Sequence, residues 1–299
     1  MHSPPHVSPG SLVRIFLLTV AALVAVPLLP ADARAQAPWQ IPAPSDTVYE
    51  VRLGDGSVIY GRIAEVDAER VVLTTVGGGR LEVERSQIRE VRPAAGRVVE
   101  GEYWNEDPGG TRLFFTATGR SLKEGESYIG TYVVVLPFGA LGLTDRITIA
   151  GGAPILFGEF EPLYLAPKVQ IVRSPTAQVS VGTLAFLFDG ETVGIAYGVG
   201  TFGSADEALS LGVGFFYAGD EVADEPAFMF GGETRVNRRV KLITENYILP
   251  DRVGTILSGG IRVIGDRFAT EVAVVGAVGD GDTGCCLPII NFSYALGKR

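Results

Sequence analysis

The chain has 299 residues, a formal net charge of −9 and only 20% charged residues, and its mean hydropathy is positive at +0.26. The acidic balance argues against nucleic acid as a partner, because phosphate binding needs clustered Lys and Arg. The only histidines, His2 and His6, lie at the N-terminus, so the remainder lacks the imidazole of most general bases, activated nucleophiles and many metal sites. We therefore expect no enzyme activity, no metal and no other cofactor.

The first predicted element is a secretory signal peptide over residues 1–35. Arg14 precedes an apolar run from Ile15 to Pro30, and the small-residue segment Ala31-Asp-Ala-Arg-Ala35 follows. A basic flank, a short apolar core and an A-x-A site are the parts of a cleaved signal peptide. The alternative is an uncleaved membrane anchor, which is disfavoured because a run of about 16 residues is short for a spanning helix. Residues 36–46, rich in Pro and Ala, are predicted to form a linker.

Residues 47–93 are predicted to form a compact module of short strands separated by tight Gly and Asp turns. Segments with strand periodicity occur at 48–53, 57–65, 71–76, 80–84 and 87–91. Short strands with such turns are typical of a small, strongly bent barrel.

A family resemblance supports this interpretation of the module. The run Val51-Arg-Leu-Gly-Asp-Gly-Ser-Val-Ile-Tyr-Gly-Arg-Ile63, the apolar segment from Val71 to Thr75, and a final strand with Ile88 and Val91 resemble the SH3-like and Sm-like small barrels. Sm proteins bind RNA, but this chain is acidic and predicted to be exported, so the resemblance implies only the fold. We expect the module to dock onto another envelope protein.

After a turn-rich linker at 94–110, residues 111–299 are predicted to form a β-barrel. Apolar runs here are broken within about a dozen residues, too short for a spanning helix, so membrane insertion would require a closed barrel. About twelve segments have strand length, an even number that is typical of single-chain outer-membrane barrels. They are 111–119, 127–138, 145–156, 162–172, 177–188, 193–203, 208–218, 226–236, 240–249, 255–265, 268–279 and 288–297.

The clearest of these segments alternate bulky apolar residues with small ones. In the segment from Leu209 to Tyr217, one face is Leu, Leu, Val, Phe and Tyr, and the other is mostly Ser and Gly; the segments 193–201 and 290–297 follow the same rule. This part resembles outer-membrane β-barrel proteins as a class. The resemblance implies bulky faces toward lipid, and we expect the glycines at 198, 200, 212 and 214 to point inward. A soluble β-sandwich is the alternative, but its second face would carry more charged residues.

Charged residues in mid-strand are expected to point into the lumen, because an Arg or Lys facing lipid costs roughly 2–4 kcal/mol at the midplane. On the segment from Phe228 to Val236 this rule places Met229, Glu233 and Arg235 inside. The same rule suggests Lys241, Glu245 and Arg262 as further members of a lumenal charge cluster. Two interpretations stay open: an ion network that fills a narrow interior, which we favour, or a selectivity constriction or polar ligand site.

The two cysteines, Cys285 and Cys286, are adjacent. A disulfide between neighbours constrains almost no chain, so an oxidised or idle pair is favoured over a redox or metal role.

These patterns together predict a non-enzymatic outer-membrane β-barrel protein surrounded by outer-membrane lipid. We expect a pore or a structural or assembly role, with the module at 47–93 as a periplasmic docking element. The alternative is a soluble periplasmic β-protein that binds a ligand or a partner.

Overall fold

The computed structural model describes residues 41–154, 162–188, 190–250, 254–279 and 282–296. The chain divides into two compact units, Met1–Pro93 and Ala94–Arg299. The predicted signal peptide and most of the predicted linker at 36–46 lie outside the described residues. In the described part of the chain, no helix is long and apolar enough to cross a membrane.

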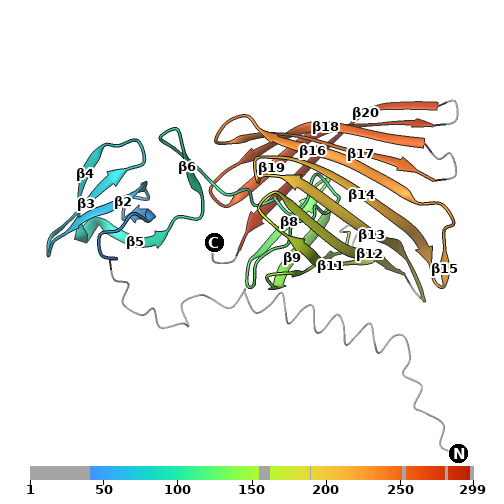
Figure 1. The fold of residues 1–299 in the computed structure, drawn as a ribbon, viewed down its shortest axis with the longest axis horizontal. Helices are drawn as coiled ribbons and strands as arrows, with labels where there is room; N and C mark the ends of the chain where they lie inside the picture. The colour runs from blue at the N-terminus through green and yellow to red at the C-terminus, as the bar shows by residue number, and fades with distance from the viewer. Residues whose placement is uncertain (1–40, 155–161, 189, 251–253, 280–281, 297–299) are drawn as a thin grey trace, which may run out of the picture. The chain divides into compact units, whose positions relative to one another are not determined.

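The first unit contains a five-stranded antiparallel sheet, close to the predicted segments (Figure 1). Its order is β4-β3-β2-β1-β5, so the last strand returns to pair with the first. A single 3-10 turn, Arg85–Gln87, connects β4 to β5. The alternating strands bury a core that includes Val51, Ile63 and Leu73. The strands are β1 (Val48–Leu53), β2 (Val58–Val66), β3 (Arg70–Thr75), β4 (Arg80–Glu84) and β5 (Ile88–Pro93).

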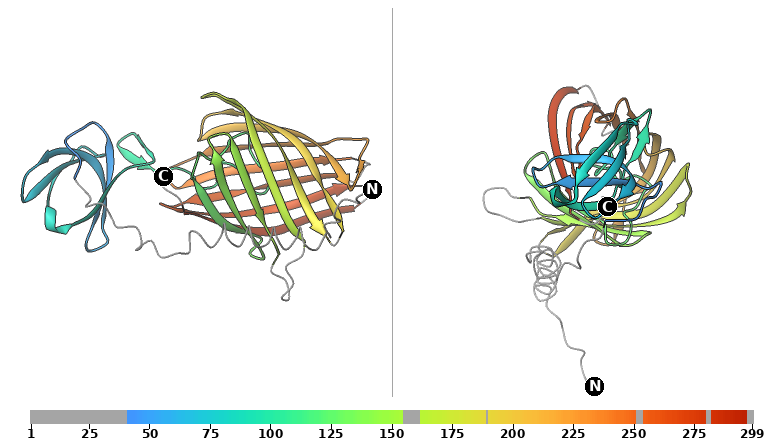
Figure 2. Two further views of the ribbon diagram at one scale, coloured as in Figure 1. Left: turned by 90° about the horizontal axis from the view of Figure 1, so that it is seen from below. Right: turned by 90° about the vertical axis from the view of Figure 1, so that its left-hand side faces the viewer.

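The second unit is a closed antiparallel barrel of twelve strands, which confirms the predicted all-β class and barrel architecture. Each strand pairs with its neighbours along the chain, and the pairing of β8 with β20 closes the circle (Figure 2). The strands are β8 (Ser127–Tyr132), β9 (Leu136–Thr144), β10 (Ile147–Gly152), β11 (Leu163–Arg173), β12 (Ala177–Phe188), β13 (Glu191–Gly203), β14 (Glu207–Ala218), β16 (Ala227–Arg235), β17 (Val240–Leu249), β18 (Gly254–Ile264), β19 (Phe268–Gly279) and β20 (Asp282–Ala295).

Three further strands lie outside the barrel wall. β15 (Glu221–Val222) extends the connection between β14 and β16. β6 (Arg97–Val99) and β7 (Glu102–Trp104) form a short hairpin inside the segment predicted as a linker at 94–110.

The outer face of the barrel is apolar. On β14, Leu209 and Leu211 are 51% and 47% exposed, whereas Ser210 between them is 1% exposed. Similar exposed apolar side chains occur on the other barrel strands. An outer wall of apolar side chains is typical of barrels that sit in membranes.

The two ends of the barrel differ in their connections. At the end where β8 begins and β20 finishes, here called the terminal end, the hairpins are joined by short turns such as 145–146 and 174–176. At the opposite end, here called the far end, the two connections 153–162 and 219–226 are longer, and the other connections are as short as those at the terminal end.

Two errors in the predicted strands cancel in the count of twelve. The segment 111–119 is not a wall strand. The segment 127–138, predicted as one strand, contains β8, a turn and the start of β9, and the strand predicted at 145–156 is the shorter β10. The turn was missed because Val133 and Val134 form it at φ of 49° and 67°, and valine is a rare choice in left-handed backbone.

The prediction of which residues face the lumen was wrong for β13. Val199 and Thr201 are buried inside, and the Oγ1 atom of Thr201 lies 2.7 Å from Oγ of Ser210, also inside. Gly198 and Gly200 therefore lie on the outer face, contrary to prediction, whereas Gly212 and Gly214 do lie on the inner face. The reason is that part of the lumen is itself apolar, so bulky residues can face inward.

Cys286 lies in β20 with a φ of 75° and is disulfide-bonded.

Candidate functional site

The chain between β7 and β8, residues 105–126, enters the lumen and is here called the plug. Its tip is a tight hairpin in which Arg112 bridges to Ala117. Leu113 and Phe114 at the tip are 0% exposed. They pack with inward side chains from five strands, namely Val199, Met229, Ile243, Ala273 and Ile289. A segment surrounded by side chains from around the wall lies within the barrel.

The plug is tied to the wall by an unbroken chain of alternating charges. Its members, in order, are Arg112, Glu271, Arg262, Asp107, Lys241, Glu233 and Arg120. Three of the seven, Arg112, Asp107 and Arg120, belong to the plug, and the other four project from β16, β17, β18 and β19. Each charge has a neighbour of opposite sign, which is the condition for burying ions at a tolerable desolvation cost, and the four cations and three carboxylates leave one positive charge in excess.

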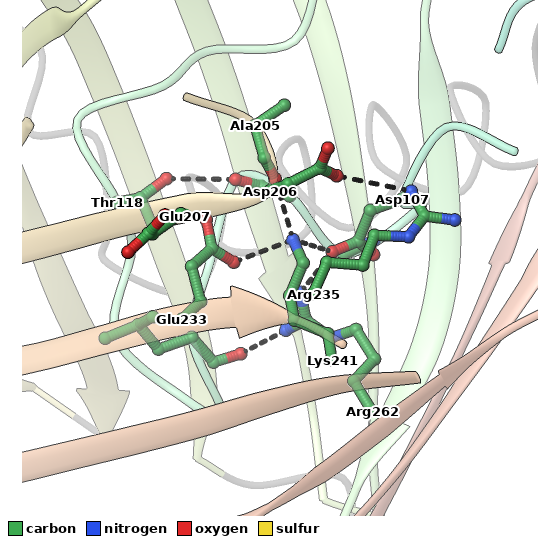
Figure 3. Close-up of polar contacts among 12 residues, drawn as sticks. Asp107, Thr118, Ala205, Asp206, Glu207, Glu233, Arg235, Lys241 and Arg262 are labelled. Atoms are coloured by element: carbon green, nitrogen blue, oxygen red, sulfur yellow. Dashed lines mark hydrogen bonds and ion pairs between the residues drawn. The ribbon is translucent and has the colours of Figure 1, made fainter. Parts of the chain in front are cut away.

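Asp107 is the central link of this chain (Figure 3). Its Oδ2 atom accepts hydrogen bonds from Nζ of Lys241 at 2.7 Å and from NH1 of Arg262 at 2.8 Å. Lys241 also donates to Glu233 at 2.9 Å and to the carbonyl of Ala205 at 3.0 Å. One plug carboxylate therefore joins two cations from neighbouring strands of the wall.

The plug tip is held through its backbone. Glu245 accepts hydrogen bonds from the amides of Phe114 at 2.6 Å, Phe115 at 3.1 Å and Thr116 at 3.2 Å. On the other side, the Asn291 amide donates to the carbonyl of Phe114 at 3.1 Å. These contacts satisfy tip groups that would otherwise be buried without partners, each at a cost of about 1–3 kcal/mol.

The opposite wall holds the segment that leaves the tip. Lys168 of β11 donates to the carbonyl of Thr118 at 2.9 Å. The carbonyl of Gly119 accepts from Gln170 at 2.9 Å and from Ser180 at 2.8 Å. The plug is thus bound on both sides of the lumen.

A second ionic group lies where the plug enters. Asp206, in the turn before β14, pairs with Arg97 of the β6–β7 hairpin and with Arg235 at 3.5 Å. The Trp104 ring lies under both guanidinium groups, with centroid distances of 5.6 Å to Arg97 and 4.9 Å to Arg235. The short hairpin therefore packs against the end of the wall, at the terminal end.

The five residues proposed as a lumenal cluster fall into three places. Glu233, Lys241 and Arg262 are in the charge chain, Glu245 is at the plug tip, and Arg235 is at the entry of the plug. All five contact the plug, the preceding hairpin or each other.

Sequence reasoning missed the plug's own contributors and two wall residues. Asp107 lies in the predicted linker at 94–110 and Arg112 in the strand predicted at 111–119. No element was predicted at Arg120. Glu271 could have been found, because it is a lone charge in mid-strand between outward residues of β19, the same signal that singled out Glu233. Lys168 in β11 carries the same signal.

The charged side chains buried at this site hold the plug, through ion pairs or, for Lys168 and Glu245, through hydrogen bonds. Among the described residues, no group of His, Cys, Asp and Glu side chains is placed to hold a metal ion. The plug therefore occupies the lumen on the side of the terminal end.

No family model matches the chain, and no curated protein matches it. Among solved structures, it is similar to a loop L8 deletion mutant of OmpT, an outer membrane protein of Vibrio cholerae, with 12% identity over 83% of this chain and 96% of that one and a TM-score of 0.35. Pseudomonas aeruginosa OccK5 (OpdH) has 8% identity, with 84% and 96% covered and a TM-score of 0.32. At these scores the superpositions are loose, and the architecture rests on the strand pairing itself.

Proposed function

We propose that the chain is a non-enzymatic outer-membrane barrel that its own plug holds shut, so that it works as a pore only when the plug moves. The observation that carries this proposal is the burial of Leu113 and Phe114 inside a closed barrel, fastened by the alternating charges. The apolar outer face supports insertion in a membrane. Short turns at the terminal end support a periplasmic location of that end, because outer-membrane barrels have short periplasmic turns.

The small module is proposed to be an SH3-like docking element for an envelope partner. Support comes from the pairing of β1 with β5 and from the 3-10 turn before β5, which give a sheet that curls back on itself. The module precedes the plug in the chain, and only residues 94–104 separate them. A partner that binds the module is therefore placed to act on the plug through a short connection.

The test is single-channel recording in planar bilayers. The full chain should be silent, because protein fills the lumen. A variant in which residues 107–120 are replaced by a flexible Gly-Ser linker should give discrete conductance steps. The wall retains the pairs Glu233–Lys241 and Arg262–Glu271 in this variant, whereas Lys168 and Glu245 lose their plug partners and face the water that enters the lumen.

Heat-modifiability on gels provides the folding control, because a closed barrel resists detergent until it is heated. A variant that shows the mobility shift but stays silent would contradict the pore and leave a structural or assembly role. Protein found in the soluble fraction without a mobility shift would favour the alternative of a soluble periplasmic β-protein.

A further inference from the structure

The outer face of the barrel has an open groove near the terminal end, over β14, β16 and β17, with a volume of about 820 Å³. Its flanks are exposed outward side chains, Phe202, Leu209 and Leu242. Its floor is Gly232, which lies between Leu209 of β14 and Thr244 of β17 in one row of paired residues. Because glycine has no side chain to fill this space, the apolar surface is hollowed here.

The groove leads toward a turn that carries two arginines. From Gly232 the chain continues through Thr234, which also lines the groove, to Val236, and the turn into β17 contains Arg238 and Arg239. At about 3.3 Å per residue, Gly232 to Val236 spans about 13 Å. One leaflet contributes about half of the roughly 30 Å hydrocarbon core of a bilayer. A lipid with its headgroup at the turn can therefore lay an acyl chain along the groove.

The backbone of the turn is fixed by side chains of the same segment. Oδ1 of Asn237 accepts hydrogen bonds from the amides of Arg239 at 2.9 Å and Val240 at 3.0 Å. The carbonyl of Arg238 accepts from the guanidinium of Arg235. The side chains of Arg238 and Arg239 take no part in these contacts and are exposed.

The two guanidinium groups are not neutralised within the described part of the chain. Among the described residues, none forms an ion pair with Arg238 or Arg239. Of the nearby carboxylates, Asp206 is paired with two other arginines, and Asp266 accepts a hydrogen bond from an asparagine at 2.9 Å. Glu207 lines the groove on β14. The turn and the groove together therefore have an excess of positive charge.

The position of the turn matches the level of lipid headgroups. The carbonyl of Arg239 accepts a hydrogen bond from the amide of Ile264, at the start of the next turn of the terminal end. Just after that turn, the exposed ring of Phe268 stacks on Phe292 with a centroid distance of 6.4 Å. Outward aromatic rings of this kind form girdles at the membrane interfaces. Among the described residues, the far-end connections contain no Lys or Arg, so cationic side chains in the connections belong to the terminal end.

We propose that this groove binds an anionic phospholipid, with the lipid phosphate at Arg238 and Arg239 and an acyl chain lying over Gly232. Guanidinium groups pair with phosphate through two parallel hydrogen bonds. An anionic lipid is favoured over a zwitterionic one because the turn offers positive charge and no carboxylate of its own. This inference rests on the proposed membrane insertion, but not on pore activity.

The test places the full chain in nanodiscs of equal parts dioleoylphosphatidylglycerol and dioleoylphosphatidylcholine. Native mass spectrometry then identifies the lipids that stay bound when the bulk bilayer is stripped away. The double variant Arg238→Gln/Arg239→Gln removes the two charges. The matched control is Arg146→Gln/Arg173→Gln, which removes two exposed arginines from other turns of the same end. Heat-modifiability shows that each barrel is folded.

We expect the full chain to retain phosphatidylglycerol several-fold over phosphatidylcholine. Arg238→Gln/Arg239→Gln should bring this ratio close to one, and the control pair should leave it within about twofold of the original. Equal retention of the two lipids by the full chain would overturn the inference and leave membrane insertion intact. An equal loss of preference in both double variants would also overturn it, because the preference would then come from the general charge of the terminal end.

A second pair of variants tests the groove with its arginines in place. Thr234→Trp fills the groove and should lower the retained phosphatidylglycerol several-fold. Val213→Trp, at an exposed outward position of β14 outside the groove, should leave it unchanged. Undiminished retention in Thr234→Trp would overturn the groove as the seat of the acyl chain. A dimer that retains no lipid would overturn the inference in favour of a second copy, and failure to enter nanodiscs would overturn membrane insertion itself.

Discussion

At the scale of single residues, the plug depends on buried charges that are tolerated only because each has a partner of opposite sign. Lys241 has 0% exposure, and its three acceptors come from the plug, from β16 and from a turn. A buried ion pair adds little stability compared with apolar residues, but the loss of one partner leaves an uncompensated charge and is costly. The chain of charges therefore specifies where the plug sits more than it raises the total stability.

We predict that Lys241→Met lowers the free energy of unfolding by about 3 kcal/mol, near the lower end of the cost of breaking a buried pair. The lower end applies because, in this variant, Asp107 still pairs with Arg262 and Glu233 still pairs with Arg120. Urea titration of the detergent-solubilised protein measures the change. The matched control is Lys123→Met, whose side chain is 56% exposed and pairs with Glu126 at 3.4 Å; it should change the value by less than about 1 kcal/mol. Equal effects of the two substitutions would refute a special role for the buried lysine.

At the scale of strands, the barrel uses glycine where an aromatic ring of the next strand covers the backbone. Gly194 of β13 lies on the outer face, opposite Tyr217 of β14. The Tyr217 ring crosses Gly194, and its hydroxyl lies 3.0 Å from Oγ1 of Thr183 on β12. A Cβ atom at position 194 would approach the Tyr217 hydroxyl to 2.6 Å and the Leu184 carbonyl to 2.2 Å. The contact ties three consecutive strands together.

We predict that Gly194→Ala lowers the free energy of unfolding by about 1–3 kcal/mol, the usual cost of overpacking. Gly198→Ala is the control on the same outer face of the same strand, because an added Cβ there has nothing within 4 Å. That substitution should be neutral or stabilise by up to about 1 kcal/mol, through the smaller entropy of the unfolded chain. The transition temperature of the gel mobility shift ranks the variants. If Gly194→Ala and Gly198→Ala lower the transition temperature equally, the contact of the Tyr217 ring with Gly194 has no structural importance.

The success of sequence reasoning also varies by element. The predicted segments 177–188, 240–249 and 268–279 coincide with β12, β17 and β19, because turns that contain Gly, Asp, Asn or Pro bound them. The turn at Val133 and Val134 has no such residues and could not be recognised. The segment 111–119 has the length of a wall strand, but its consecutive residues Leu113 and Phe114 are both buried, because the segment lies inside the lumen. Individual charged residues of the wall could be recognised from the sequence. Their partners in the plug could be identified only from the fold.

At the scale of the whole molecule, two compact units follow each other along the chain, and the plug belongs to the second. The ion pairs and hydrogen bonds described for the plug all have partners within Ala94–Arg299. We therefore expect the module to be dispensable for closing the lumen, so that the docking proposed for it is separate from closure.

We predict that a chain lacking residues 41–93 still forms a heat-modifiable barrel and stays silent in planar bilayers. The physical reason is that the charge chain, the contacts of Glu245 with the plug tip, and the packing of Trp104 between Arg97 and Arg235 all remain. The variant in which residues 107–120 are replaced by a linker is the matched comparison, because it removes the plug and keeps the module. Conductance from the chain without the module would show that the module itself holds the plug in place. In that case a partner would open the pore by displacing the module rather than by pulling on the segment at 94–104.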